Sequence, residues 1–380
     1  MKKIVLILCC LAAACGTAER AAERAPEVLL KDPAALADPG ALPLVEGRTS
    51  MVFAGEEKVS GFNLHSYIAH FDGRFWAVWS SAGVGEEDPD QFVRYATSPD
   101  GHKWSESKTL VADPDGAEGK ARWIARGIYV AEGKLTALAA YVEAAEYGQR
   151  GKAEVWPGLR LMRFEWDGES WRDRGVFADD CMNNFPPERL GGALAMVCRD
   201  AKMDVKMALS EKPGEWALTP IEAAPPYDRM DEPTFYATGG GEVHMIIRDN
   251  TKSGYLLRAV SRDDGKTWTS PVRTNYPDAT SKNFPGRLSN GWYYLVNNPN
   301  PRKRDPLAIS FSEDGWVFER PVAIRRNAPE RRFAGRAKGS GSIQYPHAIE
   351  HGGSIWVIYS TNKEDIEVTE IPMASLGLWR

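Results

Sequence analysis

The stretch at residues 261–268, Ser-Arg-Asp-Asp-Gly-Lys-Thr-Trp, decides the fold of this chain because related stretches recur along it. Shortened copies stand at residues 98–104 (SPDGHKW) and 312–318 (SEDGWVF), and degenerate copies at 166–171 (WDGESW) and 210–216 (SEKPGEW). The copies that begin at residues 210, 261 and 312 follow one another at intervals of 51 residues. The Asp carboxylate can accept N–H groups of a turn, the Gly can adopt a positive φ, and the aromatic ring can pack beneath. A turn repeated at a period of about 50 residues predicts a radial or stacked array of repeats in one domain.

Short apolar runs separate these turns. They lie at residues 74–80 (RFWAVWS), 134–141 (KLTALAAY), 243–248 (VHMIIR), 292–296 (WYYLV) and 355–360 (IWVIYS). No segment of any length shows the period of an amphipathic helix. The chain also contains 35 Gly and 25 Pro, a content that disfavours long helices. The sequence therefore predicts an all-β protein.

The repeated turn resembles the Asp box, also called the bacterial neuraminidase repeat, of the sialidase superfamily. This resemblance implies a β-propeller. About 330 residues at about 50 residues per blade give six blades, with seven as the alternative. The segment at residues 43–53 is expected to pair into the last blade and close the ring. Asp boxes also occur in propellers that are not enzymes, so the repeat by itself indicates a fold and not an activity.

The first residues form a targeting signal. Lys2 and Lys3 precede an apolar run at residues 4–14, and Ala12-Ala13-Ala14-Cys15 provides a small-residue cleavage site. This arrangement resembles the signal of bacterial lipoproteins, which implies that residues 1–15 are the signal and that Cys15 carries the lipid. Simple secretion is the alternative. We expect a tether at residues 16–43, rich in Ala, Glu and Pro, and a propeller at residues 44–380.

Composition and cysteine content restrict the partners. The net charge of −5 argues against a nucleic-acid partner, and no Cys/His spacing suggests a metal site. Outside the signal only Cys181 and Cys198 remain, and they form either a disulfide or two buried free thiols. We expect a secreted or periplasmic monomer without cofactor, in contact with the membrane through its lipid only.

The resemblance to sialidases extends to the residues of their active site. Glu232 stands in a Glu-Pro step, Arg248 closes the run that begins at Val243, Arg304 precedes a run that leads into an Asp box, and Tyr345 precedes a turn and a strand. The resemblance implies that Tyr345 is the nucleophile, that Glu232 is its base, and that Arg248 and Arg304 bind the carboxylate of the substrate. The chemistry is coherent, because the carboxylate of a sialic acid repels an anionic nucleophile but not a neutral tyrosine.

The general acid of the family is an Asp in a loop ahead of the first Asp box. Residues 85–90 (GEEDPD) occupy that place, with Asp88 as the first candidate and Asp90 as the second. Most of these carboxylates are expected to be solvated.

The chain departs from the sialidase pattern at its first strand. Sialidases begin with Phe-Arg-Ile-Pro, whereas residues 62–65 read Phe-Asn-Leu-His, so Asn63 replaces the first Arg of the family's triad and enters the predicted substrate-binding set. Arg126 or Arg122 is expected to compensate from the next blade. His65 replaces the Pro and is either a structural residue or a base that removes the C5 proton of a uronate.

Three functions follow from these residues. The first is an exo-glycosidase of sialidase type that removes terminal anionic sugars. The second is a glycosidase or lyase directed at uronic acids, with His65 as its base. The third is a glycan-binding propeller without catalysis.

Overall fold

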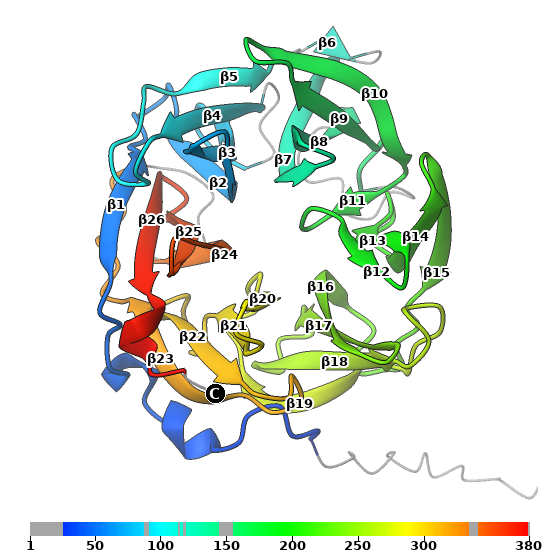
Figure 1. Ribbon diagram of the computed structural model, residues 1–380, viewed down its shortest axis with the longest axis vertical. Helices are drawn as coiled ribbons and strands as arrows, with labels where there is room; N and C mark the ends of the chain where they lie inside the picture. Colours follow the sequence, from blue (N-terminus) through cyan, green and yellow to red (C-terminus); the bar gives the residue numbers. More distant parts are fainter. Residues whose placement is uncertain are drawn as a thin grey trace, which may run out of the picture.

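The computed structural model describes residues 26–86, 91–112, 115–116, 119–143, 155–333 and 341–378. Within these ranges the strands form six sheets arranged in a ring (Figure 1). The protein is an all-β, six-bladed propeller, so the prediction of six blades is confirmed and the alternative of seven is wrong.

The first three blades are built from consecutive, mainly antiparallel strands. Blade one contains β2 (Phe62–Phe71), β3 (Arg74–Ala82), β4 (Phe92–Ser98) and β5 (Lys108–Val111). Blade two contains β6 (Asp115–Gly116), β7 (Gly119–Ala131), β8 (Lys134–Glu143), β9 (Arg160–Trp166) and β10 (Trp171–Asp179). Blade three contains β11 (Met182–Asn183), β12 (Glu188–Leu190), β13 (Ala193–Arg199), β14 (Val205–Lys212) and β15 (Glu215–Pro220).

The last three blades follow the same order. Blade four contains β16 (Met230–Gly239), β17 (Glu242–Asp249), β18 (Tyr255–Ser261) and β19 (Val272–Pro277). Blade five contains β20 (Phe284–Arg287), β21 (Tyr293–Asn297), β22 (Leu307–Ser312) and β23 (Glu319–Arg325). Blade six contains β24 (Ile343–His351), β25 (Ser354–Thr361) and β26 (Asp365–Pro372). The first long strand lies nearest the axis in every blade except blade three, where the short strands β11 and β12 pair with the inner edge of β13. In blades one to five the last strand lies at the rim (Figure 1).

The ring is closed by strand β1 (Arg48–Phe53), which comes from the start of the described chain. It pairs antiparallel with β26, from Arg48 opposite Glu370 to Phe53 opposite Ile366. Residues from the two ends of the chain therefore share one sheet, as the sequence predicted, and the open edge of blade six is covered.

The prediction of a tether up to residue 43 is wrong for residues 26–43, which pack along the rim of blades four and five as a belt (Figure 1). Leu29 and Leu30 are fully buried, and both backbone N–H groups donate to the Asn275 side chain at 2.8 Å. Glu27 forms an ion pair with Arg258 at 2.6 Å. The composition suggested a flexible linker, but the leucines find an apolar surface, so burial fixes the segment.

The repeated turn has the predicted chemistry. Asp263 accepts hydrogen bonds from the Ser261 hydroxyl and the Thr267 N–H, both at 2.8 Å, and Gly265 has a φ of 82°. The Trp268 indole donates to the Gly265 carbonyl at 2.9 Å. The two shortened copies repeat the Ser-to-Asp and Gly-to-Ser bonds. All three turns join the third strand of a blade to its outermost strand, so they lie away from the axis.

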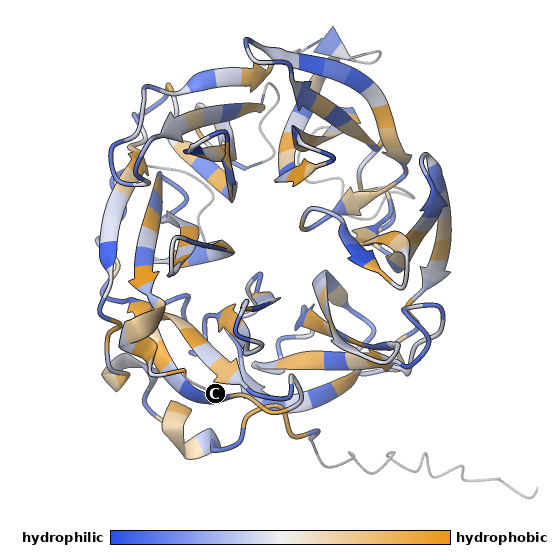
Figure 2. Ribbon diagram, in the orientation of Figure 1, coloured by the Kyte–Doolittle hydropathy of each residue, from blue (hydrophilic) through white to orange (hydrophobic). Residues whose placement is uncertain are grey.

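Three further features complete the description of the fold. Cys181 and Cys198 form a disulfide with a Cα–Cα distance of 5.2 Å, which resolves the alternative that the sequence left open. Hydrophobic residues occur in the strands of every blade, whereas many of the turns are hydrophilic (Figure 2). No helix in the described part of the chain is long and apolar enough to cross a membrane.

Candidate active site

The inner strands of four blades share one irregularity. In blades one, two, four and six, a β-bulge inserts an extra residue opposite the second strand. The bulges fall at His65, Arg126, Glu232 and Tyr345, and three of these residues have a positive φ, of 55°, 42° and 61° for His65, Glu232 and Tyr345. Positive φ is costly for residues with a side chain and is found where a structure redirects functional groups. Four predicted site residues therefore occupy equivalent bulges in different blades.

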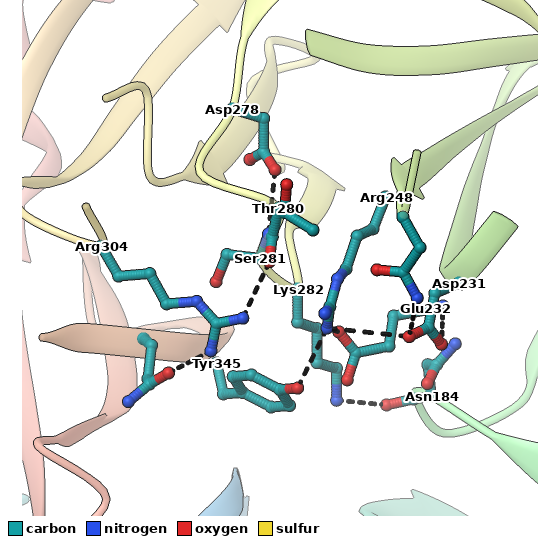
Figure 3. A network of polar contacts seen from close by, with 12 residues as sticks. Asn184, Asp231, Glu232, Arg248, Asp278, Thr280, Ser281, Lys282, Arg304 and Tyr345 are labelled. Atoms are coloured by element: carbon teal, nitrogen blue, oxygen red, sulfur yellow. Dashed lines mark hydrogen bonds and ion pairs between the residues drawn. The ribbon is translucent and has the colours of Figure 1, made fainter. Parts of the chain in front are cut away.

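Glu232, Arg248 and Tyr345 are in direct contact (Figure 3). The Arg248 Nη1 atom donates to Glu232 Oε2 at 2.6 Å and to the Tyr345 hydroxyl oxygen at 3.3 Å. The Glu232 charge also acts on the Tyr345 hydroxyl. Each of the three side chains belongs to a residue that is between 3% and 6% exposed. The structure therefore brings the predicted nucleophile and the predicted base together through Arg248, which donates to both.

The electrostatics of this set favour a neutral tyrosine beside an ionised carboxylate. Burial, followed by the Glu232 charge, raises the pKa of Tyr345 far above its usual value. Burial also acts to raise the pKa of Glu232, but the charges of Arg248, Arg199 and Lys282 outweigh it and hold that pKa below its usual range. Glu232 can therefore accept the proton that Tyr345 must lose to act as a nucleophile.

Arg304 lies on the other side of the Tyr345 ring (Figure 3). Its guanidinium carbon is 5.5 Å from the ring centroid, and its N–H groups donate to the Gln344 side chain and, at 2.8 Å, to the Thr280 carbonyl. These partners are neutral, and no described carboxylate forms an ion pair with Arg304. The guanidinium therefore keeps its charge available for a ligand.

Arg126 also reaches the site, and its residue is 3% exposed. Its charge acts on Tyr67, Glu232 and Tyr345. Its Nε and Nη1 atoms are buried and have no hydrogen-bond partner among the described residues. Arg126 is thus the second arginine of the site without a described carboxylate partner.

Asn63 does not take the place of the missing arginine, which corrects the sequence-based assignment. Its residue has no exposed surface, and both N–H groups of its amide donate to backbone carbonyls, of Ser60 at 2.7 Å and of Glu364 at 2.6 Å. Its carbonyl accepts the Trp79 indole N–H at 3.1 Å. With both donors engaged inside the protein, Asn63 joins blade one to blade six and offers none to a substrate.

His65 lies against Tyr345. Its ring contacts the Tyr345 ring edge-on at 5.3 Å between centroids, and its Nδ1 atom is 3.3 Å from the Ser80 hydroxyl. Burial, followed by the charges of Arg126 and Lys282, holds the pKa of His65 well below its usual value. The imidazole is therefore neutral near neutral pH and can accept a proton.

Sequence reasoning missed Lys282, which is buried next to Glu232 and Tyr345 (Figure 3). Its amine donates to the Asn184 carbonyl at 2.7 Å and to the Tyr67 hydroxyl oxygen at 2.9 Å. Burial and the Arg126 charge hold its pKa well below the usual value. The sequence contains one signal that could have found Lys282. The tripeptide Asn-Phe-Pro occurs at residues 184–186 and again at 283–285, directly after Lys282, which indicates equivalent positions in blades three and five.

An aromatic layer lies next to these residues. Tyr67, Phe185, Phe284 and His347 contact one another, with ring centroids between 4.6 and 6.2 Å apart. The His347 Nδ1 atom accepts the backbone N–H of Ile68 at 3.3 Å, and burial lowers the pKa of His347 to about 3. His347 is therefore a structural residue of strand β24.

The loop expected to hold the general acid is described only in part. Glu86 forms an ion pair with Lys363. Burial acts to raise the pKa of Glu86, but the Lys363 charge lowers it below the usual value, so this carboxylate is ionised. Asp88 and Asp90 lie outside the described residues, as does Cys15. The described ranges contain no group of three or more His, Cys, Asp or Glu side chains placed to hold a metal ion.

Comparisons with known proteins agree with the fold. The sequence model of the BNR repeat-like domain matches residues 73–357. A search of curated proteins found no match. A solved structure named as a sialidase superposes with a TM-score of 0.62 at 20% identity, over 87% of this chain and 33% of its own. A mutant of the NanB sialidase from Streptococcus pneumoniae gives a TM-score of 0.63 at 11% identity, over 86% of this chain and 71% of its own.

Two other solved structures match this chain over different fractions of their own length. A protein of unknown function from Dyadobacter fermentans matches over its whole length, with a TM-score of 0.62 at 15% identity and 88% of this chain covered. A Trypanosoma rangeli sialidase in complex with sialic acid gives a TM-score of 0.62 at 14% identity, over 89% of this chain and 61% of its own. This chain thus spans about a third of the first sialidase, and at these identities the likeness shows the fold alone.

Proposed function

Because this chain belongs to the BNR repeat-like domain family and folds as a sialidase-like propeller, we propose that it is an exo-glycosidase that removes a terminal acidic sugar from a glycan. The observation that carries this proposal is the contact of Glu232, Arg248 and Tyr345 at one end of the inner strands. Displacement at an anomeric carbon that bears a carboxylate requires a neutral nucleophile, a base that takes its proton and a cation. The neutral tyrosine, the ionised carboxylate and the arginine of this set can fill these three roles.

In the proposed reaction, the Tyr345 oxygen forms a bond to the anomeric carbon while the bond to the leaving oxygen breaks. Glu232 takes the tyrosine proton. A carboxylic acid of the loop at residues 85–90, either Asp88 or Asp90, gives a proton to the leaving oxygen. Water then attacks the glycosyl–tyrosine bond, the loop carboxylate takes the proton of that water, and Glu232 returns its proton to Tyr345. The two displacements together retain the configuration of the sugar.

Arg248 and Arg304 bind the carboxylate of the reacting sugar. They come from neighbouring blades, and both act strongly on Tyr345. A guanidinium offers forked N–H groups that match a carboxylate, and its charge does not depend on pH.

The contact of His65 with Tyr345 favours a second candidate function, the cleavage of uronic-acid glycans. In a lyase, the neutral His65 takes the C5 proton of a uronate, the bond from C4 to the leaving oxygen breaks, and a C4–C5 double bond forms. Tyr345 gives its proton to the leaving oxygen in that scheme. Arg304 binds the single carboxylate in either reaction.

One experiment separates these functions. The wild type, Tyr345→Phe and His65→Ala are assayed on fluorogenic sialosides and on uronic-acid oligosaccharides, with ultraviolet absorbance detecting the unsaturated product of a lyase. The glycosidase requires Tyr345→Phe to abolish turnover of the sialoside while His65→Ala has the smaller effect. The lyase requires His65→Ala to lower kcat on uronates by about 10²–10⁴-fold, the usual contribution of a positioned base. Binding without turnover of any acidic sugar would instead support a glycan-binding propeller.

The N-terminal sequence supports a location for this activity. We propose that the chain is a bacterial lipoprotein, secreted or periplasmic, that acts as a monomer and contacts the membrane through a lipid on Cys15. Its belt and propeller would then face the glycans outside the cytoplasm.

A further inference from the structure

The described cations of the site do not all have an anionic partner. Arg248 is paired with Glu232, Arg199 with Asp231, and Lys363 with Glu86. Lys282 donates to two neutral groups, the Asn184 carbonyl and the Tyr67 hydroxyl oxygen, and burial lowers its pKa. Arg126 and Arg304 are different, because guanidinium groups stay charged and neither forms an ion pair with a described carboxylate.

Two buried charges without a counter-ion are costly to a protein that binds nothing there. Arg126 is 3% exposed and Arg304 is 5% exposed. A buried charge normally has a partner, and truncation of that partner destabilises a protein strongly. The two arginines therefore indicate two negative charges in the ligand.

These arginines lie on different sides of the propeller axis. Arg126 belongs to blade two and Arg304 to blade five, and three steps around the ring separate these blades in either direction (Figure 1). Their electrostatic neighbours differ accordingly. Arg126 is the cation that acts most strongly on His65, whereas Arg248 and Arg304 act most strongly on Tyr345.

We propose that the substrate carries two acidic groups, and that Arg126 binds the second one on the side of His65, away from the Arg248 and Arg304 pair. This inference rests on the proposed function for its first acidic group only. The second group is a carboxylate or a sulfate ester, since both accept the forked N–H groups of a guanidinium.

The environment of Arg126 suits a dedicated subsite. The Tyr67 hydroxyl oxygen accepts a hydrogen bond from Lys282 at 2.9 Å, and the Tyr67 hydroxyl donates to the Asn184 carbonyl at 2.7 Å, so these neighbours of Arg126 are occupied within the protein. The buried Nε and Nη1 donors of Arg126 have no partner among the described residues and are left for a ligand. Arg126 is therefore a specificity-determining residue and not a spare member of the first arginine pair.

Calorimetric titration of the full chain tests the proposal without turnover, so it remains informative if the enzyme has no glycosidase activity. The probes are methyl glucuronide against its 2-sulfate, and the methyl sialoside against the α2,8-linked disialoside. We expect the doubly acidic member of at least one pair to bind about 10- to 100-fold more tightly, the range of a hydrogen-bonded charge. The pair that shows this preference identifies the second group as a sulfate or a carboxylate.

Variants assign the preference to a residue. Arg126→Gln should bring the ratio of the two affinities close to one, and Arg126→Lys should restore part of it. Arg304→Gln should weaken both probes and keep the ratio. Arg302→Gln, at an exposed arginine, is the matched control, and circular dichroism verifies folding of each variant. Equal binding of single and double acids by the wild type would overturn the proposal. Equal loss for both probes in Arg126→Gln would also overturn it, because Arg126 would then belong to a single arginine cluster.

Discussion

Asp278 offers the most quantitative test of the arrangement around Arg304. It precedes the loop whose Thr280 carbonyl holds Arg304, and its residue is 1% exposed. Its carboxyl oxygens accept the Ser281 backbone N–H at 2.9 Å (Figure 3) and the Asn297 side-chain amide at 3.3 Å. Burial raises the pKa of Asp278 to about 7, despite hydrogen bonds and arginine charges that act to lower it.

The raised pKa predicts a specific dependence of stability on pH. Above pH 4 the unfolded chain loses the Asp278 proton, while the folded protein keeps it until the pH passes about 7. The wild type should therefore lose stability between pH 4 and 7, at about 1.4 kcal/mol per pH unit and about 4 kcal/mol in total from this group. Asp278→Asn has a similar shape and cannot ionise, so its free energy of unfolding should rise relative to wild type over that interval.

Urea unfolding at pH values from 4 to 8, followed by tryptophan fluorescence, measures this difference. A constant offset between variant and wild type is acceptable, because the prediction concerns the slope with pH and its flattening above pH 7. Glu57→Gln, at an exposed carboxylate, is the control and should show a small slope. A difference between Asp278→Asn and wild type that stays flat or falls with rising pH would refute the reasoning.

Three further predictions concern other parts of the molecule. Leu30→Ala should reduce the free energy of unfolding in urea by about 2–5 kcal/mol, because Leu30 is fully buried, whereas Val28→Ala, at a residue 53% exposed, should change it little; equal effects would mean that the belt does not stabilise the propeller. Hydrogen bonds from Thr267 lower the pKa of Asp263 to about 2, so Asp263→Ala should be destabilising above pH 4 and its effect should shrink as the pH falls toward 2, with kcat unchanged; a growing effect at low pH would contradict this. Cys15→Ser should move the protein from the membrane fraction to the soluble fraction, and an unchanged membrane fraction would exclude a lipid anchor on that residue.

The fold was predictable because its signal is local. In the copy at residues 261–268, the Ser, Asp, Gly and Trp make their hydrogen bonds to one another within eight residues. Spacing between such turns then fixes the length of a blade. The contact among Glu232, Arg248 and Tyr345 was also predictable, since each residue has a recognisable place relative to a strand or a turn.

The errors come from contacts between segments that are distant in sequence. Asn63 is occupied by the Glu364 carbonyl and the Trp79 indole, and nothing in its own neighbourhood indicates either. The burial of Leu29 depends on blades four and five, about 245 residues later in the chain. Lys282 was overlooked because a lysine in a loop is usually solvated, and its burial depends on the neighbouring blades.

Covalent trapping of the nucleophile tests the central proposal most directly. A fluorinated acidic sugar with a fluoride leaving group slows hydrolysis of the glycosyl–enzyme bond, and mass spectrometry of proteolytic peptides then locates the label. The account predicts a label on Tyr345 in the wild type and in His65→Ala, and none in Tyr345→Phe. A label on Glu232 or another residue, or turnover of acidic glycosides without a trapped intermediate, would contradict the assignment of Tyr345 as the nucleophile.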